Sequence, residues 1–317
     1  MQTKLVLVEG VPFTGKSTLS EYAAQQLGLN GHAVEWIPEG VMLEKYFPHI
    51  IPVLDQTQPL SEESLWADWS AFVQTVKSEP ATFVVDAALS YAAVFPLLAE
   101  DQPHAAILAK VTRIAELCAP LHPHVIHLMG DTERLAHASI VDRGDKWQKH
   151  LVGQSDAAPY QKARGRSGIE GAIAFLHETQ ELMHVVLDES GWQTLTLDVT
   201  SADREANRRA VLSFLEIGEV QVDPPALAAP LQAYTGTYAE EDLDGPIGTL
   251  EVRMEQDRPV LYEPGPGMRL GPLVPVSATR FHLMATQLDV EFEVEEGIAR
   301  RLVLHTPSGK AFDFRRT

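Results

Sequence analysis

The sequence predicts an α/β protein: a parallel sheet with helices on both faces, followed by a small antiparallel all-β domain that resembles a barrel. Three observations predict this. Strand-like and helix-like segments alternate over residues 1–217, which is typical of a parallel sheet. Residues 218–230 are rich in Pro and Ala and are expected to form a linker. Over residues 231–317 apolar side chains recur at every second position, which indicates strands with one face in solvent.

The first strand, expected at Leu5–Val8, leads into a phosphate-binding motif. The chain reads Gly10-x-x-x-x-Gly15-Lys16-Ser17, which is the spacing of a P-loop. The glycines let the backbone wrap a phosphate, the lysine reaches its terminal oxygens, and the serine hydroxyl can bind Mg²⁺. A helix beginning near Gly15 adds the positive end of its dipole. The residues expected to bind ATP, or GTP as the alternative, are Gly10, Thr14, Gly15, Lys16, Ser17 and Thr18.

The remaining elements of the first domain follow from apolar periodicity. Strands are expected where short apolar runs stand between turn residues, at 33–38, 81–86, 124–130 and 193–199. Helices are expected at 19–27, 61–78, 89–100, 104–121, 131–189 and 203–217. Ser61 or Ser64 can cap the second of these helices, and Pro96 is expected to kink or break the third. For Trp66 and Trp69 core packing is the more common role than stacking on a base.

Acidic side chains are expected at the carboxyl edge of the parallel sheet, where ligands bind in such folds. Asp86 ends the third strand and can hold the Mg²⁺ shell with Ser17, and its alternative role is an N-cap for the next helix. Glu39 follows the second strand and can accept the proton of a substrate hydroxyl, and its alternative role is a solvated loop residue. Glu9 is a third acid near the site, for which a structural hydrogen bond to the loop is expected.

Cations gather in one part of this acidic chain: Arg134, Arg143, Lys146, Lys149, Lys162, Arg164 and Arg166. An arginine aimed at a transferring phosphoryl group contributes roughly 10³–10⁵ in rate, because it neutralises the charge on the phosphate oxygens. Arg143 and Arg164 are expected to do this, with Arg166 as a further nucleotide contact. The alternative is a solvated helix face, since Asp142 and Asp145 stand near Arg143 and can pair with it.

The composition narrows the class of partner. A formal net charge of −19 over 317 residues offers no basic footprint for a nucleic acid. The apolar stretches are too short to span a bilayer, and the first residues lead straight into the P-loop, so neither a membrane anchor nor a signal peptide is expected. The single cysteine, Cys118, allows no intrachain disulfide and suits a reducing cytoplasm. We expect a cytoplasmic protein that binds a small-molecule phosphate acceptor, with its oligomeric state left open.

Four stretches of the first 217 residues, VEGVPFTGKST, PEG, VVDAALSY and DRGDKWQKHL, resemble the P-loop nucleoside and nucleotide kinases, the thymidylate-kinase-like branch in particular. The resemblance implies a five-stranded P-loop kinase-type sheet, ATP with Mg²⁺, and an arginine-bearing lid from the stretches DRG and ARGR. It also implies that Glu39 is the base, as in deoxynucleoside kinases. The Asp-Arg pair of thymidylate kinases is missing, since Ala87 follows Asp86. The acceptor is therefore expected to be a nucleoside, a nucleotide or another hydroxyl compound.

The last domain is expected to be a small antiparallel sheet or barrel. Alternating strands are predicted at 248–255, 280–286, 289–297, 299–306 and 311–316, with turn residues between them. The domain resembles the small β domain that follows serine β-lactamase-like and esterase-like proteins, which implies an accessory or ligand-binding role. The residues that carry this resemblance are Tyr234, Gly236, Tyr238, Leu273, Pro275, Phe281, Phe312, Phe314 and Arg315.

The function expected from these patterns is an ATP-dependent phosphotransferase that acts on a small molecule. Its expected catalytic residues are Lys16, Glu39, Asp86, Arg143 and Arg164. The alternative is a nucleotide-dependent switch or sensor, which binds and slowly hydrolyses ATP or GTP and engages a partner through its β domain. The two differ in whether nucleotide turnover depends on an acceptor.

Overall fold

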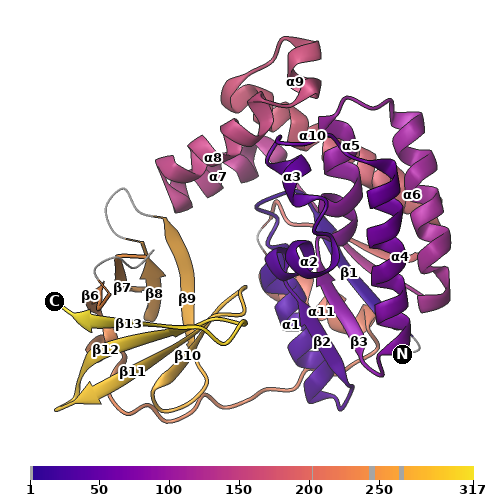
Figure 1. Ribbon diagram of the computed structural model, residues 1–317. Coiled ribbons are helices and arrows are strands. Elements are labelled where there is room, and N and C mark those ends of the chain that lie inside the picture. The colour runs from indigo at the N-terminus through magenta and orange to yellow at the C-terminus, as the bar shows by residue number, and fades with distance from the viewer. Residues whose placement is uncertain (1–2, 202, 243–246, 264–267) are drawn as a thin grey trace. The chain divides into compact units, whose positions relative to one another are not determined.

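The computed structural model describes residues 3–201, 203–242, 247–263 and 268–317. The chain forms two compact units, one from the residues up to Ser139 with Gln148–Val220, the other from Ile140–Trp147 with Gln221–Thr317. The first contains a parallel sheet with helices, and the second contains a closed antiparallel barrel (Figure 1). The fold class expected from the sequence is thereby confirmed. Within the described ranges, no helix has the length and apolar character needed to cross a bilayer.

The described sheet of the first unit has five parallel strands in the order β2-β3-β1-β4-β5. They are β1 (Leu5–Gly10), β2 (Val34–Ile37), β3 (Thr82–Asp86), β4 (His124–Met129) and β5 (Gln193–Asp198). β1 is central and pairs with β3 on one side and with β4 on the other. The chain leaves β1 toward β2 and leaves β3 toward β4, which are opposite directions along the sheet. In open parallel sheets, ligands bind outside the carboxyl ends of the strands, at the point where neighbouring connections leave in opposite directions.

Helices connect these strands. They are α1 (Lys16–Leu29), α2 (Glu39–Tyr46), α3 (Ile51–Leu54), α4 (Glu62–Ser78), the π-helix η1 (Ser90–Val94), α5 (Phe95–Ala99), α6 (His104–Cys118), the 3₁₀ turn η2 (Ala119–Leu121), α7 (Thr132–Arg143), α8 (Asp145–Asp156), α9 (Pro159–Arg164), α10 (Gly168–Ser190) and α11 (Arg204–Phe214). The stretch 131–189 contains four separate helices. Gly144 and Gly165 adopt positive φ at two of the breaks, and Pro159 begins α9 at the third.

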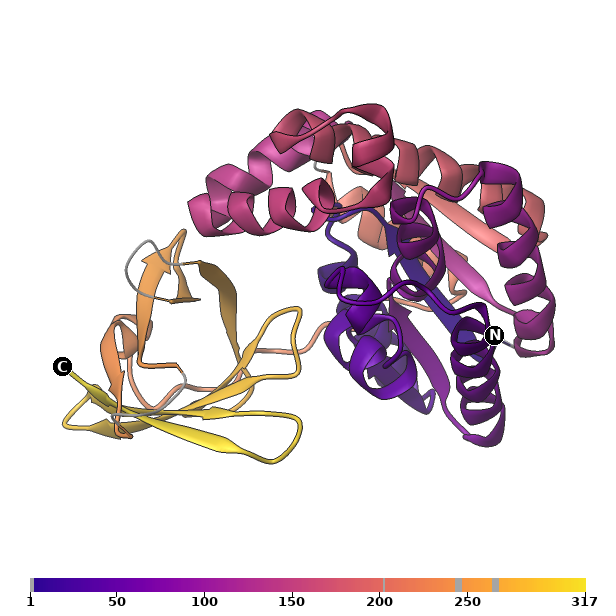
Figure 2. The same cartoon turned by 45° about the horizontal axis from the view of Figure 1, so that its top comes forward.

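Alternation along β1 divides the core of the first unit into two layers. Leu5 and Leu7 pack with residues of α4, α5, α6 and α10, whereas Val6 and Val8 pack with residues of α1 and α11. All four side chains are fully buried. Burial on both faces explains why this strand is a continuous apolar run rather than an alternating one. The helices on the two sides of the sheet can be followed in Figure 1 and, after rotation, in Figure 2.

The helical run after β3 begins as the π-helix η1 and continues as α5. Pro96 is the second residue of α5, and although it has no N–H to donate to the turn before it, the chain stays helical around it. The expected interruption therefore takes the form of a change from π to α hydrogen bonding at Phe95. A single π turn inside a helical run is often found at functional sites.

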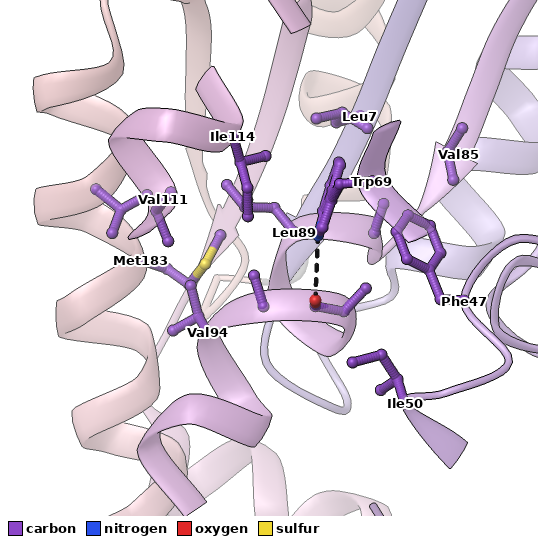
Figure 3. Close-up of a cluster of buried hydrophobic side chains, with 14 of the residues drawn as sticks. Leu7, Phe47, Ile50, Trp69, Val85, Leu89, Val94, Val111, Ile114 and Met183 are labelled. Carbon is purple, nitrogen blue, oxygen red and sulfur yellow. Dashed lines mark hydrogen bonds between the residues drawn. The ribbon is translucent and has the colours of Figure 1, made fainter. Parts of the chain in front are cut away.

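The larger core layer contains the fully buried Trp69 (Figure 3). Its ring meets that of Phe47 edge to face, with 4.9 Å between the centroids. Its Nε1 donates a hydrogen bond to the Ala92 carbonyl oxygen of η1 at 3.2 Å. Core packing is thus confirmed for Trp69. Trp66 is half-buried, and the Arg113 guanidinium lies 4.0 Å from its ring centroid.

Trp69→Phe is expected to lower the free energy of unfolding by about 1–3 kcal/mol. The smaller ring leaves a gap, and the Ala92 carbonyl loses its buried donor. Trp66→Phe is the matched control, because its Nε1 donates to Glu62 at the exposed surface, and a loss within about 0.5 kcal/mol is expected. Urea unfolding of both variants measures the difference, and equal losses would contradict the role given to the Ala92 bond.

The second unit contains a closed barrel in the order β10-β11-β12-β13-β6-β7-β8-β9. The strands are β6 (Gly236–Glu240), β7 (Thr249–Glu255), β8 (Arg258–Tyr262), β9 (Arg269–Pro275), β10 (Arg280–Leu283), β11 (Asp289–Glu295), β12 (Ile298–His305) and β13 (Ala311–Arg316). The alternating pattern predicts five of these. It misses β6, β8 and β9, where Gly236, Pro259 and Gly271 interrupt the pattern, because Gly and Pro are uncommon inside strands.

The barrel interior is filled by packed aromatic side chains. Tyr234, Phe281 and Phe292 meet edge to face, with ring centroids 4.9–5.4 Å apart. The Tyr238 hydroxyl donates to the Tyr234 carbonyl at 2.7 Å. Gly236 has φ of 145°, a conformation that L side chains rarely adopt, which explains the glycine between the two tyrosines. The Tyr234-x-Gly236-x-Tyr238 motif therefore closes and fills the barrel.

Candidate functional site

The P-loop forms the turn between β1 and α1. Gly15 is the N-cap of α1 with φ of 86°, and no side chain hydrogen-bonds to this cap. No acidic residue stands in the first turn of the helix. The backbone N–H groups of Lys16, Ser17 and Thr18 have no intrahelical partner, since the first bond of the helix runs from Leu19 N to Gly15 O at 3.0 Å. This helix end can therefore bind an anion with three N–H groups and its dipole.

The Val11 carbonyl inside the loop accepts hydrogen bonds from two side chains that the sequence predicts to bind phosphate. Thr14 Oγ1 donates to it at 2.9 Å and Lys16 Nζ at 3.1 Å. Lys16 is buried, and its Nζ lies 5.7 Å from the centroid of the Tyr91 ring. The ammonium group is thus held within the loop at the carboxyl edge of β1.

Two loop positions have special backbone conformations. Gly10 has φ of 147°, and a Cβ there would lie 2.5 Å from the Leu128 carbonyl oxygen of β4, so only glycine fits. Phe13 has φ of 77°, which is strained for a residue with a side chain. Its ring packs against the cluster of Val11 and Leu151, which joins the loop to α8. This apolar contact offsets part of the strain at Phe13.

Strand geometry separates Glu9 from Asp86. Asp86 pairs in register with Val8, so both side chains point to the face that α1 covers. Glu9 is one residue further along β1 and points to the opposite face, where η1 begins. The two acids therefore lie on opposite faces of the sheet.

Asp86 is a fully buried carboxylate, and in the described part of the chain neither oxygen has a hydrogen-bond partner of ordinary geometry. Burial raises the pKa of Asp86 above its usual value, against the lowering effects of the Lys16 ammonium, the Ser17 hydroxyl and the Glu39 backbone N–H. Buried polar atoms are almost always paired in native proteins. A fully buried carboxylate beside an ammonium and a hydroxyl thus fits a cation that the Asp86 and Ser17 side chains can both bind.

Glu9 occupies the N-cap role that was the alternative for Asp86. Its carboxylate accepts hydrogen bonds from Leu89 N at 2.8 Å, from Ser90 N at 2.9 Å and from Ser90 Oγ. Glu9 thus forms structural hydrogen bonds, but with the segment after β3 and not with the P-loop, which is the partner that the sequence predicts. Burial raises the pKa of Glu9 to about 7, although these hydrogen bonds and Lys16 lower it.

Glu9 is expected to make the free protein less stable as the pH rises from about 4.5 to 7. In this window the unfolded carboxyl ionises near its usual pKa of 4.5, whereas the folded one stays protonated up to about 7. The stability that protonated Glu9 contributes is present below pH 4.5 and lost through pH 7, up to about 3 kcal/mol. Glu9→Gln should remove this slope in urea unfolding at pH 5–8. An unchanged slope would show that Glu9 is ionised throughout.

Glu39 lies next to Asp86 through its backbone. β2 ends at Ile37, and Glu39 is the first residue of α2, with Pro38 as its N-cap. Its backbone N–H is close enough to the Asp86 carboxylate to lower its pKa. The first turn of α2 therefore brings Glu39 to the edge of the P-loop site, and its role as a base stays a prediction.

The structure places the three candidate arginines in other contacts. Arg143 belongs to the second unit, where its guanidinium lies 4.6 Å from the Trp147 ring centroid. Arg164 forms an ion pair with Asp101, which raises the pKa of Arg164 against the lowering effect of burial, and its guanidinium lies 3.8 Å from the Tyr160 ring centroid. Arg166 donates to the Tyr160 hydroxyl at 3.3 Å. Their assignment to a phosphoryl group stays a prediction that requires these contacts to open.

Metal ligation by protein side chains alone is not indicated in the described ranges, which hold no group of three or more His, Cys, Asp or Glu side chains suited to a metal ion. Mg²⁺ is commonly held by one or two protein oxygens together with substrate phosphates and water. The Ser17 hydroxyl and the Asp86 carboxylate, beside the helix end that can bind phosphate, fit this mode of binding.

Sequence reasoning missed Ser90 as part of the site. Its hydroxyl lies between the first P-loop residue and Glu9, since Gly10 N donates to Ser90 Oγ at 3.4 Å. The sequence of β1 does contain a signal for this network. Glu9 ends a strand that is buried on both faces, so its carboxylate needs buried hydrogen-bond donors. The identity of the donors depends on which strand lies beside β1.

No protein-family model matches this chain, and it has no match among curated proteins.

Proposed function

We propose that the protein is an ATP-dependent phosphotransferase that transfers a phosphoryl group to a small hydroxyl compound, with Mg²⁺ as the metal. One observation supports this above the others: the fully buried Asp86 carboxylate lies beside the Lys16 ammonium and the Ser17 hydroxyl at the N-terminus of α1. A P-loop that bound only a simple anion would not need a buried carboxylate next to its lysine, because burying a carboxylate costs free energy.

Each residue has a distinct part in this proposal. The N–H groups of the first turn of α1 and the Lys16 ammonium bind the phosphates of ATP. Ser17 and Asp86 hold Mg²⁺, which neutralises charge on the phosphate oxygens. Glu39 accepts the proton of the acceptor hydroxyl. At the same time the hydroxyl oxygen bonds to the γ-phosphorus, and the bond between this phosphorus and ADP breaks. Arg164 and Arg166 are the candidate lid residues of the first unit.

The proposal is tested with a panel of nucleosides, nucleotides, sugars and amino alcohols, each mixed with the protein and Mg²⁺-ATP or Mg²⁺-GTP. ADP or GDP release that depends on the acceptor, with a phosphorylated acceptor found by mass spectrometry, supports a kinase. Slow release that no acceptor changes supports the alternative, a nucleotide-dependent switch. Calorimetry that detects no Mg²⁺-assisted binding of either nucleotide would rule out both.

Glu39→Gln is expected to lower kcat by about 10²–10⁴, because the amide cannot accept the proton of the acceptor hydroxyl. The affinity for ATP should change by less than about twofold, since the side chain of residue 39 does not bind the phosphates in this scheme. Glu44→Gln, on the same helix α2, is the matched control and should leave kcat unchanged. Unchanged turnover in Glu39→Gln would exclude Glu39 as the base.

For the barrel we propose an accessory role. The residues that carry its resemblance to other β domains include the buried Tyr234, Tyr238, Leu273, Phe281 and Phe314. Because these side chains are buried, their role is to pack the barrel interior, and they are not exposed to react with a substrate.

A further inference from the structure

We infer that Glu9 is a positioning residue of the phosphate site: it caps the helical segment after β3 and orients the Ser90 hydroxyl toward the Gly10 amide. Asp86 takes no part in this cap and lies beside Lys16 and Ser17. This inference rests on the proposed function, because it concerns how the chain prepares the same site for a nucleotide.

The cap is the first part of the argument. After β3 the chain turns at Ala87, which has φ of 61°, and the N–H groups of Leu89 and Ser90 then need acceptors. Asp86 is the nearest acid in sequence and has the side chain of a good N-cap. The structure gives both N–H groups to the two oxygens of Glu9, at 2.8 and 2.9 Å. The more distant acid caps the segment, and the nearer acid lies beside Lys16, Ser17 and the Glu39 N–H instead.

The second part is the link to the P-loop. Ser90 Oγ donates its proton to Glu9, so its lone pairs are available to the Gly10 N–H, which lies 3.4 Å away. Gly10 begins the loop and is held against the Leu128 carbonyl of β4, so a small displacement there is passed to the following residues. The chain of donors therefore runs from Gly10 through Ser90 to Glu9, and each group in it is buried.

The groups that face Glu9 support a role in positioning rather than in chemistry. On β4, its partner in register is the fully buried His127, whose pKa burial lowers to about 4, so this ring is neutral near pH 7. From α1, the Lys16 ammonium lowers the pKa of Glu9, while burial raises it to about 7. Glu9 faces away from Asp86 across the sheet, so it is not placed to bind the same ion.

The test is a double-mutant cycle on ATP affinity, with Glu9→Gln, Ser90→Ala and the double variant measured by calorimetry with Mg²⁺. Each single variant is expected to weaken ATP binding about tenfold, because a buried amide of the loop loses its oriented acceptor. The double variant should be no more than about twofold weaker than either single one, since both act through the same chain of groups. In turnover assays, the KM for ATP should rise, whereas kcat should stay within about twofold of the wild-type value.

Ser190→Ala is the matched control. Its hydroxyl bonds within the C-terminal turn of α10, donating to Leu187 O at 2.7 Å and accepting from Trp192 N, so ATP affinity should not change. If Glu9→Gln does not fold, the comparison of Ser90→Ala with Ser190→Ala decides, and equal affinities overturn the inference.

Two further results would overturn it. If Glu9→Gln binds ATP with wild-type affinity but has a lower unfolding midpoint, Glu9 is only a structural cap. A loss in the double variant that is the product of the two single losses, about 100-fold, would show that Glu9 does not act through Ser90. If the wild-type protein itself binds no ATP, the proposed function fails and the inference fails with it, a result distinct from the other two.

Discussion

Lys16→Ala is expected to abolish phosphotransfer, with kcat/KM for ATP lowered by about 10³-fold or more. The Lys16 ammonium is buried in the loop, bonded to the Val11 carbonyl at 3.1 Å and close enough to Asp86 to lower its pKa. A cation fixed in a site of low dielectric stabilises phosphate charge without reorganising, which is where electrostatic catalysis is strongest. Its loss also leaves Asp86 without its nearest counter-charge, so the metal site weakens at the same time.

The matched control for this variant is Lys110→Ala. Lys110 is also partly buried, but its partners are Gln102 and Glu62 at the edge of α6 and α4. Turnover in this control should stay within about twofold of the wild type. Initial rates of ADP release with the acceptor found by screening measure both variants. Full activity in Lys16→Ala would show that residues 10–18 do not bind the transferred phosphates.

Asp86→Asn is expected to lower turnover by about 10²–10³-fold, the scale of removing one preorganised charged group, while it raises the thermal unfolding midpoint of the free protein. The two effects have one cause. Burial penalises the charged carboxylate more than the nearby Lys16 ammonium, Ser17 hydroxyl and Glu39 N–H stabilise it, as the raised pKa of Asp86 shows. A neutral amide of the same shape removes the penalty and also removes the metal ligand. Calorimetric scanning and Mg²⁺ titration of ATP binding measure the two effects.

Asp68→Asn is the control with the opposite sign. Asp68 is also buried, but it accepts hydrogen bonds from His49, with 2.7 Å between Asp68 Oδ1 and His49 Nδ1. The amide weakens these bonds, so the unfolding free energy should fall by about 1 kcal/mol while turnover is unchanged. If both aspartate variants destabilised the protein, Asp86 would have to be counted as a structural residue with partners of its own.

The fold was largely predictable from local patterns, for reasons that particular residues illustrate. The apolar run Leu5–Val8 followed by Gly10 and Lys16 predicts a buried parallel strand, a turn and a helix, and the structure has all three. The alternating residues of 289–297 predict a strand of the barrel, which is β11. The boundaries failed where a single residue decides them, as at Gly144, which separates α7 from α8.

The backbone geometry of the candidate site was predictable where one stretch of the chain forms it, whereas contacts between distant segments were not predictable. The P-loop lies within nine residues, Gly10–Thr18, and the spacing of its glycines, lysine and serine predicts the conformation of the loop. The arginines differ, because Arg164 pairs with Asp101 and Arg143 joins the second unit, which their positions in the sequence do not reveal. Long charged side chains take whichever partner the fold places within reach.

The sequence by itself determined that a loop able to bind phosphate stands between a buried strand and a helix, because glycine conformation, lysine charge and helix dipole act within one turn of the chain. Tertiary structure alone decided which acid lies beside Lys16 and Ser17 and which acid caps the segment after β3. Glu9 and Asp86 are 77 residues apart and equally acidic, and the difference arises because adjacent strands β1 and β3 point them to opposite faces of one sheet.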